Sequence, residues 1–537
     1  MRNLFFGIFI SVFILTGVLS YFHAGFLWSL ILTVPVFAVG LYESLQTKKA
    51  ILRNFPLLGN FRYLFEMIRP EIQQYFIETE TDGFPVAREI RSLVYQRAKR
   101  QTDTLPFGTQ RDVYREGYEW INHSLSPKHV DPTKLRVKIG GPLCKRPYSA
   151  SLFNISAMSY GALSSNAIQA LNGGAHLGGF YHNTGEGGVS PHHLSGGGDL
   201  VWQIGTGYFG CRNEDGNFSP DLFKQQSSHE NIKMIEIKLS QGAKPSHGGI
   251  LPKAKITEEI KQIRKVSGDH DVVSPPAHTT FSSPRGLLNF VSQLRELSGG
   301  KPVGFKLCVG QPSEFIAICK AMVETKITVD FITVDGGEGG TGAAPLEFSN
   351  SVGAPLEEGL TFVNDILKGF NLRKDIKIIC SGKVMTGFNL YSRLALGADL
   401  CNSARGMMLA LGCIQARKCN TNHCPTGVAT SNKQLVYGLV PEDKKVRVYN
   451  FHKNTLHAFA ELLGASGLVS SQQISRFQVN RRVAGGSVKN YEQLFPTIAD
   501  GCFLNGLIPK KYNFDFELAH PDSFELIYSY DRLPNVG

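Results

Sequence analysis

The sequence predicts an α/β protein whose main part is a (β/α)8 barrel, preceded by a transmembrane helical hairpin and a helical connecting segment. Three observations predict it. From about residue 149, short apolar runs alternate with helix-like periods, which is typical of a parallel sheet with helical crossovers. Two charge-free apolar runs occupy residues 1–45. Between these regions, residues 46–148 combine amphipathic stretches with Pro and Gly breaks.

The first 45 residues predict the membrane hairpin. The run Leu4–Ser20 carries no charge, and after a short break a second apolar run extends from Phe26 to Leu41. Each run is near the lower limit for a spanning helix, which needs about 17–25 residues. Arg2 precedes the first run and Lys48 and Lys49 follow the second, so positive-inside counting places both ends in the cytoplasm.

We therefore expect an anchor in the inner (cytoplasmic) membrane, with the catalytic domain facing the cytoplasm. The alternative is a cleaved signal peptide followed by one anchor, which would place a group of reduced cysteines in an oxidising compartment. Residues 48–146 hold 18 Lys and Arg against 11 Asp and Glu. This surplus suits anionic membrane lipid. No nucleic-acid-binding motif accompanies the charge, so no nucleic-acid partner is expected.

The segment 46–148 is expected to be helical and irregular, with amphipathic helices over Asn60–Arg69 and Pro85–Arg100. Residues 149–435 carry eight candidate strands, and eight strands fit a TIM barrel, whose strand C-terminal loops carry the site. A doubly wound open sheet is the alternative, but no G-x-G-x-x-G follows the first strand. Residues 436–537 are expected to close the domain. The strands are Phe153–Met158, Gly179–His182, Val201–Ile204, Ile232–Leu239, Val303–Val309, Asp330–Val334, Ile376–Cys380 and Ala398–Asn402.

Three cysteines, spaced C-x5-C-x4-C-P, follow a helix-like run over Ser403–Leu411. They are Cys413, Cys419 and Cys424. Three thiolates within a dozen residues can converge on one inorganic centre, and sulfur ligands favour zinc or an iron–sulfur cluster. The absence of a fourth nearby cysteine favours a three-iron cluster. The alternatives are a zinc site completed by His423 and buried free cysteines.

The loops after the last two predicted strands indicate a phosphate site. In barrels this is the usual place for a phosphate, held by backbone N–H groups and a helix N-terminus. The simplest ligand is FMN, and ordinary turns with capping serines are the alternative. The side chains and glycine expected to contact the phosphate are Ser381, Gly382, Lys383, Ser403 and Arg405.

Small residues after the first predicted strand suit a flat aromatic ring. Ala157, Met158 and Ser159 would let an isoalloxazine ring lie against the backbone. Lys306, on a later strand, would point a cation into the barrel mouth and stabilise negative charge at the flavin N1/C2 carbonyl. A solvated lysine is the alternative.

Two further loops predict a pocket for a dicarboxylate or 2-oxo acid. Glu186 stands in a glycine loop, and Gln241 and Lys244 lie three residues apart after another strand. Such a ligand requires a fixed cation and amide donors. A buried glutamate beside them could handle protons if its pKa is raised. The alternative is a turn-forming glycine cluster with an exposed glutamate.

Taken together, these stretches resemble the FMN- and cluster-binding synthase domain of glutamate synthase. The matching pieces span roughly residues 140–435 in the same order as in the family, and the cysteine block is the most specific. They are SAMSYGALS (156–164), NTGEGG (183–188), KLSQGAKPSHGG (238–249), DGGEGGTGAAP (335–345), SGKVMTG (381–387) and LGCIQARKCNTNHCPTGVAT (411–430).

The resemblance implies FMN and a [3Fe–4S] cluster ligated by Cys413, Cys419 and Cys424. Gly336 and Gly337 belong to a glycine cluster that suits close approach of a cofactor. The resemblance also implies which residues line the 2-oxoglutarate pocket, namely Glu186, Gln241 and Lys244, with Lys238 and Lys306 near the flavin.

In the family's chemistry ammonia adds to 2-oxoglutarate, reduced FMN transfers a hydride to the resulting imine to form L-glutamate, and the cluster refills the flavin. Here Lys244 is expected to bind a substrate carboxylate. Glu186 is expected to handle protons or to position ammonia. The expected enzyme is thus a glutamate synthase-like oxidoreductase acting on the CH–NH2 group of donors.

The chain departs from the full family enzyme in three ways. It begins Met1–Arg2–Asn3 with the apolar hairpin rather than with a glutaminase domain and its cysteine nucleophile, and no dinucleotide-binding motif is present. We therefore expect separate partners: a reductase or ferredoxin-like electron donor and an amidotransferase. The glycine-rich DGGEGGTG is longer than the family's usual form. Another amine or amino acid, or a membrane-bound electron-transfer subunit, is the alternative function.

Overall fold

The computed structural model describes residues 1–101 and 103–525. The chain divides into two compact units, Met1–Arg88 and Glu89–Gly537, each of which is described by itself.

The first unit begins with two apolar helices. Helix α1 (Arg2–Phe22) is followed by a 3-10 turn (Ala24–Ser29) and helix α2 (Leu30–Leu45). The segments Arg2–Phe22 and Ala24–Leu45 have mean hydropathies of 2.2 and 2.0 and are long and apolar enough to cross a membrane. The rings of Phe5 and Phe37 stack with their centroids 5.8 Å apart, which joins the two helices.

A buried carboxylate organises the rest of this unit. Glu43 accepts hydrogen bonds from the backbone N–H of Leu57, at 2.7 Å, and from Asn60 Nδ2, at 2.6 Å. These bonds connect the end of α2 to the start of α4 (Gly59–Ile72), across the short helix α3 (Ala50–Asn54). The amphipathic helix predicted over residues 60–69 is therefore present and slightly longer.

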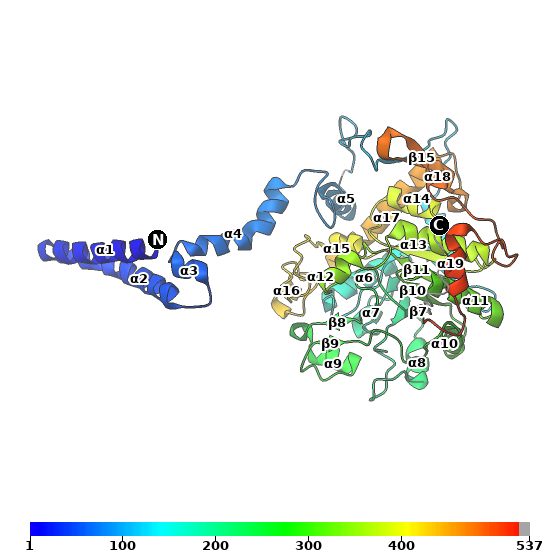
Figure 1. Ribbon diagram of the computed structural model, residues 1–537, viewed down its shortest axis with the longest axis horizontal. Coiled ribbons are helices and arrows are strands. Elements are labelled where there is room, and N and C mark those ends of the chain that lie inside the picture. Colours follow the sequence, from blue (N-terminus) through cyan, green and yellow to red (C-terminus); the bar gives the residue numbers. More distant parts are fainter. Residues whose placement is uncertain (102, 526–537) are drawn as a thin grey trace, which may run out of the picture. The chain divides into compact units, whose positions relative to one another are not determined.

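The second unit contains a closed barrel of eight parallel strands, so the predicted (β/α)8 fold is confirmed (Figure 1). Every predicted strand has its counterpart, and the strands pair in sequence order until the last closes on the first. Their bounds are β4 (Phe153–Ile155), β5 (His182–Asn183), β6 (Leu200–Ile204), β7 (Ile232–Lys238), β10 (Val303–Leu307), β11 (Phe331–Asp335), β12 (Lys377–Ser381) and β13 (Leu400–Ser403).

Helices surround these strands. Several start at a Ser or Thr whose side chain accepts a hydrogen bond from the first turn, as Ser164, Ser283 and Thr386 do. The connecting helices are α6 (Ser165–Gly178), α7 (Pro191–Leu194), α8 (Pro220–Ser227), α9 (Glu258–Arg264), α10 (Pro284–Leu297), α11 (Pro312–Thr325), α12 (Leu346–Ser351), α13 (Leu356–Gly369), α14 (Gly387–Ala395) and α15 (Arg405–Leu411).

The remaining elements of this unit flank the barrel. Helix α17 (Pro441–Ala465) packs on α6, α14 and α15, and the strands β1 (Glu119–Ile121), β14 (Val479–Arg482) and β15 (Val488–Asn490) form a small antiparallel sheet. The other elements are α5 (Arg88–Lys99), β2 (Arg136–Ile139), β3 (Tyr148–Ser151), β8 (Ile250–Leu251), β9 (Val272–Val273), α16 (Lys433–Tyr437), α18 (Tyr491–Leu494) and α19 (Lys510–Leu518).

An ion pair is buried just before β11. The Asp330 carboxylate accepts from Arg295 Nη2 at 2.9 Å, from the Val303 N–H at 2.8 Å and from the Gly141 N–H at 2.8 Å. One side chain thus joins α10, β10 and the chain that leads into β3, at the edge of the barrel away from the strand C-terminal loops. Its role is to support the scaffold.

Candidate active site at the barrel mouth

A buried ion pair lies at the C-terminal ends of β5 and β7. Lys238 Nζ is 2.8 Å from Glu186 Oε1, and the two side chains are only 8% and 20% exposed. Burial disfavours the Glu186 carboxylate, but the Lys238 ammonium, aided by Lys244 and Arg264, outweighs it and holds the pKa of Glu186 below its usual value. The condition for proton handling, a raised pKa, is therefore not met, and Glu186 is an ionised acceptor.

Two more cations lie around this pair. Lys244 is buried, and its Nζ donates to the Ala343 carbonyl at 3.0 Å. Burial lowers its pKa to about 8, with Glu186 opposing the shift. Arg264, at the end of α9, donates from Nη2 to the Tyr160 carbonyl at 3.0 Å, while its buried Nε has no partner among the described residues. Three cations thus surround one carboxylate, so the site has positive charge available for an anionic ligand.

Lys306 lies on the next strand, β10, and is 3.2 Å from Asp335 Oδ2 at the end of β11. Burial disfavours its charge, but Asp335 and Glu236 outweigh burial and raise the pKa of Lys306. Asp335 also accepts from the Gly242 N–H at 3.0 Å. A β-carbon on Gly242 would lie 1.6 Å from the Gly336 carbonyl oxygen, so the loops after β7 and β11 touch at their backbones.

The loop after β4 lies against the glycine loop after β5. The Met158 N–H donates to the Asn183 carbonyl at 3.1 Å, and a β-carbon on Gly185 would lie 2.9 Å from the Ser159 nitrogen. Gly185 has φ +63°, a conformation that favours glycine. This contact brings Ala157–Ser159 next to the loop that carries Glu186. The predicted flavin-facing and substrate loops are therefore neighbours. Gln241, in the loop after β7, is half-buried.

The predicted phosphate residues come together at the ends of β12 and β13. Ser381 Oγ is 3.2 Å from Ser156 Oγ, and Ser403 Oγ donates to the Val384 carbonyl at 2.6 Å. Burial lowers the pKa of Lys383, and the nearby Arg405 lowers it further. Glu338 partly offsets this repulsion between the two cations, and a bound anion would remove the rest. Gly336 belongs to the same edge, because its N–H donates to the Ser381 carbonyl at 3.1 Å.

The three predicted cysteine ligands lie in one loop region beyond α15. Cys413 and Cys419 are half-buried and Cys424 is buried; Cys419 and Cys424 both act on the ionisation of Cys413, and Cys424 acts on that of Cys419. Burial raises the pKa of Cys413 to about 11. Burial opposes ionisation of Cys424 as well, but the N–H groups of Ala429 and Val428 and the Thr426 side chain lower its pKa.

In residues 1–101 and 103–525, no group of three His, Cys, Asp or Glu side chains is arranged to hold one ion, which includes a set completed by His423.

Comparisons with known proteins place the chain in a family. The description "Conserved region in glutamate synthase" matches residues 123–469. The glutamate synthase large subunit-like protein YerD of Bacillus subtilis is 38% identical over 508 residues, which cover 86% of this chain and 96% of that protein. The chain belongs to the glutamate synthase family.

Two further similarities accompany this result. An archaeal glutamate synthase [NADPH] of Methanocaldococcus jannaschii is 34% identical over 378 residues, covering 70% of each chain. A solved structure of a flavocytochrome b2 variant with pyruvate bound aligns at 12% identity with a TM-score of 0.40, covering 85% of this chain and 93% of that chain. Membership of the glutamate synthase family indicates an oxidoreductase of glutamate synthase type.

The glutamate synthase barrel also has charged residues that sequence reasoning missed. Arg264 had no local signal, because the surrounding KITEEIKQIR segment has the pattern of a solvated helix. Asp335 follows directly after a predicted strand, and that position could have identified it as the partner of Lys306. Lys255 is fully buried but lies in a segment, PKAK, that gives no sign of burial.

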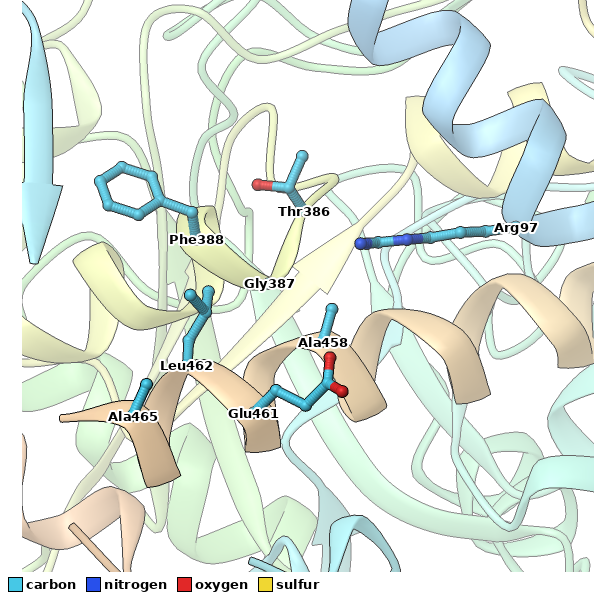
Figure 2. A pocket seen from close by; sticks show the side chains of 8 residues that line it. All are labelled: Arg97, Thr386, Gly387, Phe388, Ala458, Glu461, Leu462 and Ala465. Atoms are coloured by element: carbon cyan, nitrogen blue, oxygen red, sulfur yellow. The ribbon is translucent and has the colours of Figure 1, made fainter. Parts of the chain in front are cut away.

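A cavity of about 400 Å³ lies elsewhere in this glutamate synthase-family domain, between α5, α14 and α17 (Figure 2). It contains none of the predicted site residues. Arg97 points toward it from α5, and the rest of its lining comes from the start of α14 and from α17. The lining residues are Arg97, Thr386, Gly387, Phe388, Ala458, Glu461, Leu462 and Ala465.

Proposed function

We propose that this chain catalyses the FMN-dependent reductive amination of 2-oxoglutarate to L-glutamate, with electrons relayed by an iron–sulfur cluster. The observation that carries the proposal is the buried Glu186–Lys238 pair with Lys244 and Arg264 beside it. A 2-oxo dicarboxylate needs fixed cations for its two carboxylates, and an amination needs an acceptor that orients the incoming amine. The barrel mouth offers both within one buried group of side chains.

The residues at the mouth fit FMN. The paired cations Lys383 and Arg405, with Ser381 and Ser403, suit its phosphate, and the neighbouring loop Ala157–Ser159 suits its ring. Lys306 keeps its charge and would stabilise negative charge on the ring. When bound, FMN supplies the hydride that reduces a C=N bond. Gly336 and Gly337, beside Ser381, would line the cofactor's edge.

In this proposal the protein's own residues bind, orient and exclude water. Lys244 and Arg264 hold the substrate carboxylates, and the Gln241 amide donates to the 2-oxo acid. Glu186 remains ionised, so its carboxylate accepts N–H bonds from ammonia and directs it at the keto carbon. Lys238 balances the charge of Glu186. The buried position of these groups strengthens each interaction because water does not compete for them.

The residues at Cys413, Cys419 and Cys424 fit a [3Fe–4S] cluster. The stabilised Cys424 thiolate and the influence of Cys419 and Cys424 on Cys413 support the use of the three cysteines as ligands. Electrons would come from a separate reductase or ferredoxin-like donor, and ammonia from solution or a separate amidotransferase. The two apolar helices support an anchor in the cytoplasmic membrane, with the catalytic unit in the cytoplasm and lipid around the hairpin.

The deciding experiment is anaerobic. The protein is purified in detergent, its flavin is reduced with dithionite, and reoxidation is followed by absorbance after addition of 2-oxoglutarate with and without ammonium. We expect reoxidation only when both are present, with formation of L-glutamate. Reoxidation with other amines but not with ammonium would show that the nitrogen substrate is another amine. A fully loaded flavin that no oxo acid reoxidises would overturn the proposal in favour of an electron-transfer subunit.

A further inference from the structure

Lys255 is a fully buried lysine outside the substrate pocket. It ends a short 3-10 turn (Lys253–Lys255) and is only 2% exposed. Its Nζ donates to the Ala162 carbonyl at 2.6 Å and to the Cys419 carbonyl at 3.1 Å. Burying an ammonium group is unfavourable unless hydrogen bonds and a negative charge compensate for lost hydration.

The two acceptors belong to the two loops that would hold redox groups. Ala162 lies in the 156–164 stretch after β4, and Cys419 is the second predicted cluster ligand. A second hydrogen bond joins the turn to the cysteine loop: Asn422 Nδ2 donates to the Ala254 carbonyl at 2.7 Å. Asn422 is itself held by Thr430 and Ser431, which donate to its Oδ1. The turn at residues 253–255 therefore connects the flavin-facing loop to the cysteine loop.

The charge of Lys255 has no carboxylate partner in the described part of the chain. Both hydrogen-bond acceptors are neutral carbonyls. One of these carbonyls belongs to Cys419, so the Lys255 ammonium lies directly against the backbone of a predicted cluster ligand. A buried ammonium held only by neutral carbonyls, one of them on a predicted cluster ligand, points to a negative partner bound in the cysteine loop.

We propose that Lys255 is a positioning residue that sets the reduction potential of the cluster and ties the cluster loop to the flavin loop. This proposal rests on the proposed function, because it requires the cluster. Accepting one electron makes the cluster more negative, and a fixed cation in a poorly hydrated site stabilises that added charge. Lys255 therefore raises the potential of the one-electron couple, which favours passage of electrons from the donor into the cluster.

The test compares Lys255→Met with Lys253→Met. Lys253 lies in the same turn but is exposed, so it is the matched control. Iron and sulfide are assayed first, and the cluster's potential is then measured by redox titration with electron paramagnetic resonance. We expect Lys255→Met to retain its iron and to disfavour reduction about tenfold, which corresponds to about 59 mV for one electron. We expect Lys253→Met to match the unaltered protein and Lys255→Arg to restore most of the potential.

A full complement of iron with an unshifted potential in Lys255→Met would overturn the proposal. If Lys255→Met does not fold or loses iron, Lys255→Gln serves instead, because it keeps a hydrogen-bond donor while removing the charge. An unshifted potential in Lys255→Gln would also overturn the proposal. Absence of iron and sulfide from the unaltered protein would show that no cluster is bound. That result refutes part of the proposed function and is distinct from failure of the Lys255 proposal.

Discussion

Lys244 carries a charge that its surroundings make sensitive to pH. Burial lowers its pKa to about 8, so the ammonium form predominates below that pH and is lost as the pH rises through it. If this charge binds a substrate carboxylate, kcat/KM for 2-oxoglutarate falls as the pH rises through about 8, because that ratio reports the free enzyme. In Lys244→Arg the fall is absent up to about pH 10, since arginine keeps its charge. Steady-state rates over this pH range measure the fall in kcat/KM. If Lys244→Arg shows the same fall, a group other than Lys244 causes it.

Glu186 provides a second test at the scale of one residue. Glu186→Gln removes the carboxylate that would direct ammonia but keeps the side-chain shape. We expect ammonia-dependent flavin reoxidation to slow by about 10²-fold, the order of the cost of misplacing a reactant, while 2-oxoglutarate still perturbs the flavin spectrum. Stopped-flow absorbance gives both quantities. Glu230→Gln, at a side chain that is 79% exposed, is the control. Equal rates in the two variants would show that Glu186 does not direct ammonia.

At the scale of elements, the cysteine loop gives the clearest prediction. Cys419→Ser is expected to abolish the visible absorption and most of the iron of the cluster while FMN remains bound. The half-buried Cys144, which lies outside the loop, is the control as Cys144→Ser. Iron, sulfide and flavin analysis measures the outcome. Full iron and sulfide in Cys419→Ser would refute this ligand assignment.

The ion pair before β11 predicts how the barrel is stabilised. Asp330→Ala leaves the buried Arg295 guanidinium without its partner and the N–H groups of Val303 and Gly141 without an acceptor. Breaking such a pair lowers the free energy of unfolding by about 3–5 kcal/mol. Urea denaturation of the detergent-solubilised protein measures the loss. The exposed Asp269 provides the control Asp269→Ala, for which a change within about 0.5 kcal/mol is expected.

Sequence reasoning found the strands because they are short, largely apolar runs, most of them ending in Gly, Ser or Asp, and such runs are buried on both sides in a barrel. It also identified the glycine and cysteine loops, because their sequence patterns are local. It did not find Arg264 or Lys255, which lie in charged segments and reach the site only through the fold. The direction of the Glu186 pKa depends on Lys238, which is 52 residues away in sequence. A local sequence pattern cannot identify a charge partner that lies so far along the chain.

For the whole molecule, the division into two units predicts how membrane attachment and catalysis separate. A chain that starts at Glu89 retains the whole barrel unit, whereas the apolar helices belong to the unit Met1–Arg88. We expect the full chain to stay in the membrane pellet after alkaline carbonate washing and the shortened chain to be recovered in the soluble fraction with its FMN. Ultracentrifugation and flavin fluorescence measure both. A full chain released by carbonate would contradict the anchor.

The backbone contact between Gly242 and Gly336 has a consequence for changing what this barrel accepts. A β-carbon at Gly242 would overlap the opposing carbonyl, so the loop that presents Gln241 and Lys244 cannot be altered there unless the loop after β11 changes as well. When Gln241 or Lys244 is varied to change the oxo-acid preference, Gly242 therefore has to stay glycine, or the loop after β11 has to be changed with it. Libraries that randomise position 242 while the loop after β11 is kept would return mostly misfolded proteins.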